Sequence, residues 1–170
     1  MLYFAYGSNM STPRLRRRVP SAEPLARAVL HDHRLTFHKV GRDGSAKCDI
    51  VAAPPHLVHG VVFRIEPCQR AALDHAEGLG EGYDDIRLQV RMADGSYVET
   101  FAYRATRTDP DLEPFTWYVQ HVLRGAFEHG LPDDYIRMLR ATRARPDPDT
   151  DRDAREMAVH VSTAGQRHAR

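Results

Sequence analysis

Short β-rich runs separated by turn-forming residues fill the first 103 positions, and this pattern constrains the fold of the chain most strongly. Apolar and polar residues alternate over 86–92, Asp94-Gly95 makes a turn, and 97–103 alternates again, which predicts a β-hairpin. Further strands are expected at 2–5, 25–40, 48–53 and 57–65. Strands joined by hairpins and short helices in so small a chain predict a mixed or antiparallel sheet, which can close into a barrel.

Helical signals interrupt and then follow these strands. Pro13 and Pro67 suit the first turns of two helices, and apolar residues recur at helical spacing after position 114. We expect helices over 13–18, from 67 to near 78, over 115–126 and over 135–139. Pro54-Pro55 forbids continuous pairing between the two runs that flank it. The chain is therefore predicted to be an α+β protein.

The composition excludes several classes of function. The 170 residues suit one domain that closes its core without disulfides, and 24 Lys and Arg residues balance 23 Asp and Glu residues to a net charge of +1. The basic cluster of Arg14, Arg16, Arg17 and Arg18 lacks interleaved aromatic residues, so we interpret it as a solvated helix face rather than a nucleic-acid patch. No apolar run approaches the ~20 residues of a membrane span, and no secretory signal is visible, so we expect a cytoplasmic protein.

Cysteine and histidine form no recognisable metal or redox motif. Cys48 and Cys68 lack CxxC spacing, and we expect both to be free buried thiols. His31 and His33 would share one face of a strand, but no third ligand stands at a familiar spacing. We therefore expect no metal site.

The last part of the chain differs in composition from the rest. Residues 142–170 include 11 charged residues, and their large aliphatic residues are only Met157, Val159 and Val161. Such a segment can add little to a core. We expect a catalytic domain over 1–141 and a charged tail over 142–170 that is flexible or docked on a partner.

Tyr6-Gly7-Ser8-Asn9 is the first candidate functional segment. It follows a predicted strand and precedes a predicted helix, so its backbone N–H groups can form a concave anion site. An ordinary strand-to-helix turn has the same composition, and this alternative stays open on composition alone.

Glu77 is the second candidate. It ends a predicted helix three residues after Asp74, and both the helix end and this neighbouring carboxylate disfavour its negative charge. Such an environment suits a carboxyl group that carries protons near neutral pH. The alternative is a solvated carboxylate at an exposed helix end.

The two segments together resemble the γ-glutamylcyclotransferase family of the AIG2-like superfamily. The resemblance rests on 2–10 and on Leu73-Asp74-His75-Ala76-Glu77-Gly78, and it continues through 60–63, Tyr83, Tyr103, 114–118 and 130–132, covering about residues 1–140. It implies a small mixed β-barrel with surrounding helices and no cofactor. It also implies Glu77 as the catalytic residue and a substrate-binding set of Tyr3, Phe4, Ala5, Tyr6, Gly7, Ser8, Asn9, Tyr118, Tyr83 and Tyr103.

The implied reaction cyclises the γ-glutamyl group of a γ-glutamyl amino acid to 5-oxoproline and frees the amino acid. Asn9 favours this branch over branches that act on glutathione or on γ-glutamylamines, while a short 78–83 segment leaves the leaving group in doubt. One alternative is a cyclotransferase that frees an amine or a specialised metabolite. Another is a non-catalytic small-molecule-binding module, and a third is a protein that binds a partner through its tail. The oligomeric state is open between monomer and homodimer.

Overall fold

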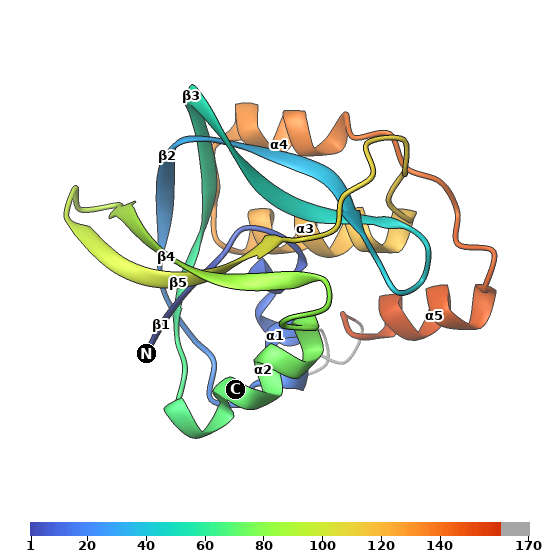
Figure 1. Cartoon of the computed structure of the whole chain (residues 1–170), viewed down its shortest axis with the longest axis horizontal. Coiled ribbons are helices and arrows are strands. Elements are labelled where there is room, and N and C mark those ends of the chain that lie inside the picture. The colour runs from blue at the N-terminus through green and yellow to red at the C-terminus, as the bar shows by residue number, and fades with distance from the viewer. Residues whose placement is uncertain (161–170) are drawn as a thin grey trace, which may run out of the picture.

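A closed barrel of five strands forms the body of the chain in the computed structural model, which describes residues 1–160 (Figure 1). The strands are β1 (Leu2–Ala5), β2 (Glu23–Val40), β3 (Ala46–Arg64), β4 (Tyr83–Met92) and β5 (Tyr97–Ala105). Their order is β1-β3-β2-β4-β5, with antiparallel pairing except where β1 closes the barrel in parallel against β5, pairing Tyr3 with Phe101. The predicted α+β fold with a mixed barrel is confirmed.

The ladder between β2 and β3, the two longest strands, has its largest irregularity in its middle. It skips residues 53–56, which include Pro54-Pro55, opposite the single residue Asp32. Proline has no N–H group to donate to a ladder, so this segment bulges out of the pairing. The expected interruption is confirmed, although the two β-rich runs belong to one strand. The β4–β5 hairpin is confirmed as well.

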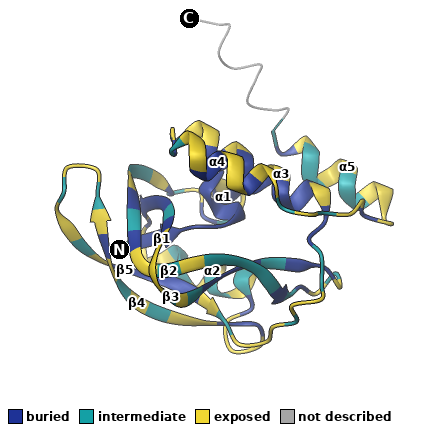
Figure 2. Cartoon of the chain, turned by 90° about the horizontal axis from the view of Figure 1, so that it is seen from above, coloured by how far each residue is buried: buried dark blue, intermediate teal, exposed yellow. Residues whose placement is uncertain are grey.

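Helices cover the barrel mainly from one side. The helical segments within residues 1–160 are η1 (Ser8–Met10), α1 (Thr12–Arg18), η2 (Pro67–Gln69), α2 (Arg70–Glu77), α3 (Thr116–Glu128), α4 (Asp133–Arg140) and α5 (Thr150–Ala158). Figure 2 shows α1, α3, α4 and α5 on the same side of the strands, and α2 contacts α1. Phe4, Phe63 and Phe101 from the barrel share one buried core with Phe115, which immediately precedes α3. Each such side chain contributes about 1.5–3 kcal/mol through burial.

The segment after residue 141 differs from the sequence expectation. Its backbone pairs with the start of α3, where the Thr116 N–H donates to the Arg145 carbonyl at 2.9 Å. The Trp117 Nε1–H donates to the buried Asp147 carboxylate at 2.7 Å, and Arg152 pairs with the same carboxylate at 2.6 Å. Residues 142–160 are thus folded onto their own domain.

Polar contacts hold α5 on the domain. Its low apolar content therefore did not indicate that it would pack there. The Glu156 carboxylate forms an ion pair with Arg14 and lies 3.0 Å from Nε2 of His121, whose side chain is fully buried. A hydrogen-bonded charged anchor of this kind leaves no apolar signature in the sequence. The last part of the expected 142–170 tail, residues 161–170, lies outside the described residues.

Two further expectations need correction. Cys48 is buried, but Cys68 is exposed, because it lies in the short turn η2 at the surface. The basic cluster is only partly a solvated face: Arg16 and Arg17 are exposed, whereas Arg14 is buried. Within residues 1–160, no helix is long and apolar enough to cross a membrane.

Candidate active site

The two candidate segments meet at one small recess beyond the end of β1. Its lining residues are Tyr3, Tyr6, Gly7, Ser8, Asn9, Cys48, Glu77, Tyr83, Tyr103 and Tyr118. All of these except Cys48 belong to the set predicted from the sequence. The structure places the other two predicted residues elsewhere, since Phe4 and Ala5 are completely buried in the core and do not line the recess. Phe4 lies on the opposite face of β1 from Tyr3, as alternation along a strand requires.

Glu77 reaches the recess from the last position of α2. The helix ends there because Gly78 adopts a left-handed conformation, with φ of 72°, which most residues avoid. Oε1 of Glu77 accepts hydrogen bonds from Nδ2 of Asn9 at 2.9 Å and from the Arg18 guanidinium at 2.6 Å. Oε2 accepts none from residues 1–160. One oxygen is therefore anchored, and the other is available to a ligand.

Asn9 links the loop to the carboxylate. Its Oδ1 accepts a hydrogen bond from Arg18 at 2.9 Å, and its Nδ2 also donates to the Tyr3 hydroxyl at 3.0 Å. With both ends of the amide engaged, the Asn9 side chain is fixed in one orientation.

Arg18 was missed as a site residue by the sequence analysis. Its place in a basic cluster suggested solvent, and only the packing of α1 beside α2 brings it to Glu77. No spacing within the sequence could have linked two residues 59 positions apart.

Asp74 does not act on Glu77 in the way the sequence suggested. Its Oδ1 accepts hydrogen bonds from Arg70 at 2.6 Å and from the Tyr103 hydroxyl at 2.6 Å. Because Arg70 neutralises this carboxylate, the repulsion expected between Asp74 and Glu77 is weakened.

The loop itself offers unused backbone donors. None of the N–H groups of Gly7, Ser8 and Asn9 donates a hydrogen bond to another described residue, whereas the Met10 N–H turns back to the Gly7 carbonyl at 3.0 Å. A Cβ atom on Gly7 would stand 2.9 Å from the Cβ of Cys48, so glycine is required for this close approach. Consecutive free N–H groups of this kind bind anionic oxygens.

Contacts with the backbone fix three of the five tyrosines that line the recess. The Tyr83 hydroxyl donates to the Cys48 carbonyl at 2.6 Å, the Tyr118 hydroxyl accepts from the Cys48 N–H at 2.9 Å, and the Tyr6 hydroxyl donates to the Tyr103 carbonyl. Burial raises the pKa of Tyr6, Tyr83 and Tyr118 well above the ordinary value for a phenol, so these side chains stay neutral. Glu77 is the one acidic side chain among the residues that line the recess.

The recess opens into a wider outer cavity. The recess has a volume of about 30 Å³, which suits a small polar group, whereas the outer cavity measures about 340 Å³. Ser8, Glu77, Tyr83 and Tyr118 line both spaces. The recess and the outer cavity thus form one site, with a narrow end for a polar head group and a broad end for the rest of a ligand.

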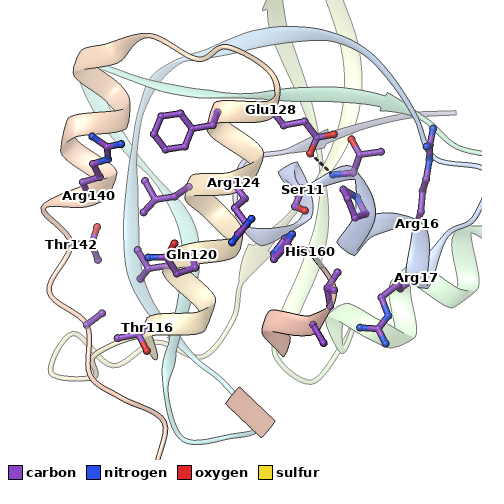
Figure 3. Close-up of a pocket in the computed structure, with 18 residues that line it drawn as sticks. Ser11, Arg16, Arg17, Thr116, Gln120, Arg124, Glu128, Arg140, Thr142 and His160 are labelled. Atoms are coloured by element: carbon purple, nitrogen blue, oxygen red, sulfur yellow. Dashed lines mark hydrogen bonds between the residues drawn. The ribbon is translucent and has the colours of Figure 1, made fainter. Parts of the chain in front are cut away.

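A larger groove lies between α1, α3 and the end of α5 (Figure 3). It measures about 1670 Å³ and is bordered by four arginines, Arg16, Arg17, Arg124 and Arg140. The hydrogen bond from the Thr12 N–H to Glu128 lies beside it. None of the predicted site residues lines it. Size alone therefore does not identify the site in this molecule, and the recess at Glu77 is the candidate active site.

Comparison with known proteins identifies the family. The model of the AIG2-like family matches residues 57–139. The γ-glutamylcyclotransferase of Mus musculus is 34% identical over 82% of this chain and 77% of its own length, and that of Homo sapiens is 33% identical over the same shares. A solved structure of a γ-glutamyl cyclotransferase superposes with a TM-score of 0.81 at 30% identity, covering 85% of this chain and 89% of that one. The chain is therefore an enzyme that belongs to the γ-glutamylcyclotransferase family.

Proposed function

We propose that this enzyme cyclises the γ-glutamyl group of γ-glutamyl amino acids to 5-oxoproline and releases the free amino acid. The observation that carries the proposal is the free Oε2 of Glu77 in a recess beside three unused N–H groups. The relatives' names support the class of reaction. Glu77 is the proposed general base and, later, the general acid.

The reaction needs one bond formed and one bond broken. The α-amine of the γ-glutamyl group attacks its own γ-carbonyl carbon, which closes a five-membered lactam and breaks the amide bond to the leaving nitrogen. Because both reacting groups belong to one substrate, holding the chain folded can lower the barrier by about 7–11 kcal/mol. Positioning is thus the larger part of the catalytic task.

Glu77 carries the proton between the two nitrogens. The α-amine is protonated at neutral pH, so it must lose a proton before it attacks. Oε2 of Glu77 takes this proton and then gives it to the leaving nitrogen, a role worth about 10²–10⁴-fold in rate. Asn9 and Arg18 hold Oε1, which keeps Oε2 directed to the ligand.

The loop donors bind an oxygen that carries negative charge. This oxygen belongs either to the substrate α-carboxylate or to the tetrahedral intermediate. If it belongs to the tetrahedral intermediate, removal of one N–H donor raises the activation free energy by about 3–4 kcal/mol. Tyr3, Tyr83, Tyr103 and Tyr118 shape the recess around the polar head group of the glutamyl chain as neutral side chains.

No step of this proposal requires a metal or an organic cofactor. The partner is a small-molecule substrate, and the proposal places the enzyme in the cytoplasm without nucleic-acid or membrane partners. A size measurement in solution decides between the monomer and the homodimer.

Turnover of defined substrates tests the proposal. Purified protein is incubated with γ-glutamyl-alanine, a γ-glutamylamine and glutathione, and 5-oxoproline is measured. Release from γ-glutamyl-alanine is expected, together with its loss in Glu77→Gln and its retention in Glu99→Gln, whose side chain is exposed on β5. Absence of 5-oxoproline with every substrate would contradict the proposal.

A further inference from the structure

The outer cavity is the space into which a leaving group would extend. A substrate that places its scissile amide at Oε2 of Glu77 directs the polar head group of its glutamyl part to the recess and its leaving group to the outer cavity, because Glu77 lines both spaces. The side chains of the outer cavity thus decide which leaving groups fit.

Lys39 is an unusual member of this lining. It lies on β2, is only 7% exposed, and its ammonium makes no ion pair and donates no hydrogen bond within residues 1–160. Its Nζ lies 4.7 Å from the centroid of the Tyr83 ring. Gly82 leaves room beside it, since a Cβ there would stand 2.9 Å from Nζ. A buried cation without a carboxylate is costly and marks a site for an anion.

Lys47, which neighbours Lys39 in the sheet, has the partners that Lys39 lacks in the described part of the chain. Lys47 pairs with Lys39 across the β2–β3 ladder, a position where like charges destabilise a sheet. The Lys47 ammonium is neutralised by Asp43 at 2.7 Å, donates to the Ser45 hydroxyl at 2.6 Å, and lies 4.5 Å from the Trp117 ring centroid. Of the two ammonium groups, only that of Lys39 is left for a ligand.

Glu77 does not take the role of this missing partner. Arg18 already forms the ion pair with Glu77, at 2.6 Å, and no ion pair joins Glu77 to Lys39. Burial lowers the pKa of Lys39, while the negative charge of Glu77 opposes this effect. A second carboxylate, supplied by the substrate, would complete the arrangement.

We propose that Lys39 binds the carboxylate of the leaving amino acid and so makes the enzyme prefer γ-glutamyl amino acids to γ-glutamylamines. In an amino-acid leaving group this carboxylate stands one carbon from the nitrogen that Glu77 protonates, so it enters the outer cavity with that nitrogen. The inference rests on the proposed function and adds a specificity-determining residue to it.

Three matched substrates test the inference. γ-Glutamyl-alanine carries the carboxylate, γ-glutamyl-alaninamide replaces it with a neutral group of similar shape, and γ-glutamyl-ethylamine lacks it. The kcat/KM for release of 5-oxoproline is measured with the wild type, Lys39→Met, Lys39→Arg and the control Arg64→Met, which removes one exposed charge at the far end of β3.

The expected result is a substrate-dependent loss. Lys39→Met should lower kcat/KM for γ-glutamyl-alanine roughly 10–100-fold, mainly through KM, because a charge-assisted hydrogen bond is lost. The same variant should change the alaninamide and ethylamine reactions less than threefold. Lys39→Arg should restore most of the preference for the carboxylate, and Arg64→Met should leave it intact.

Three outcomes overturn the inference in distinguishable ways. If Lys39→Met lowers kcat/KM equally for all three substrates, with unchanged thermal unfolding, Lys39 does not bind the carboxylate of the leaving group. If the wild type turns over the alaninamide or the ethylamine substrate as well as γ-glutamyl-alanine, the specificity fails while the proposed function stands. Failure of the wild type on all three would remove the proposed function itself, and this inference with it.

Discussion

Replacing Asn9 with alanine tests whether the loop holds the carboxylate through this amide. The side chain is 4% exposed and makes three hydrogen bonds, to Tyr3, Glu77 and Arg18. Asn9→Ala leaves the buried Tyr3 hydroxyl without its partner, which costs about 1–3 kcal/mol. For a domain of this size, that loss lowers Tm by roughly 2–12 °C.

The effect on turnover follows from the bond to Glu77. A hydrogen bond to a charged group contributes about 1.5–3 kcal/mol, so Asn9→Ala should lower kcat/KM for γ-glutamyl-alanine by roughly one to two orders of magnitude. Arg18 still holds Oε1, so some turnover remains. Initial rates of 5-oxoproline release give the change in kcat/KM, and thermal unfolding of the same preparations gives the change in Tm.

Asn9→Asp separates electrostatics from shape. It has nearly the same size as asparagine and can still accept from Arg18, but it turns a carboxylate oxygen instead of Nδ2 toward Glu77, 2.9 Å away. Like charges at this distance repel, so Asn9→Asp should be slower than Asn9→Ala at neutral pH. Equal or faster turnover by Asn9→Asp would refute the reasoning that Nδ2 supports the Glu77 carboxylate.

Two further predictions follow from the same structure. Gly7→Ala should lower kcat/KM at least 10-fold and also lower Tm, because its Cβ would stand 2.9 Å from the buried Cys48 side chain and push the loop donors out of place. Wild-type kinetics would show that the position of these donors is unimportant. Burial lowers the pKa of His121 to about 4, below the ordinary ~6.5 of an unfolded histidine, so the folded state binds fewer protons and stability should fall as pH drops from about 6.5 to 4. Thermal unfolding of His121→Gln should depend less on pH over this window, and an unchanged pH dependence would contradict the assignment.

Local patterns in the sequence were sufficient for most of the barrel. The β4–β5 hairpin follows from alternation around Asp94-Gly95, and the break opposite Asp32 follows from two prolines that cannot donate. The end of α2 follows from Gly78. Each of these features depends on neighbours within a few residues, which a sequence displays directly.

The features that the sequence did not reveal are long-range and polar. Arg18 pairs with Glu77 across 59 positions, and only the fold brings Lys39 of β2 to the outer cavity that Glu77 also lines. The anchoring of α5 depends on Glu156 with Arg14, 142 positions apart. Charged residues usually face solvent, so composition assigns all of them to the surface, and only the fold shows which ones are buried with partners.

The rate of 5-oxoproline release by Glu77→Gln tests the central claim most directly. Glutamine keeps the shape of the side chain but cannot take a proton from the α-amine. We therefore expect release from γ-glutamyl-alanine to fall at least 100-fold, with Tm nearly unchanged, while Asp74→Asn loses less and Glu99→Gln keeps the wild-type rate. Turnover by Glu77→Gln within a few-fold of the wild type would contradict the assignment of Glu77 as the proton carrier.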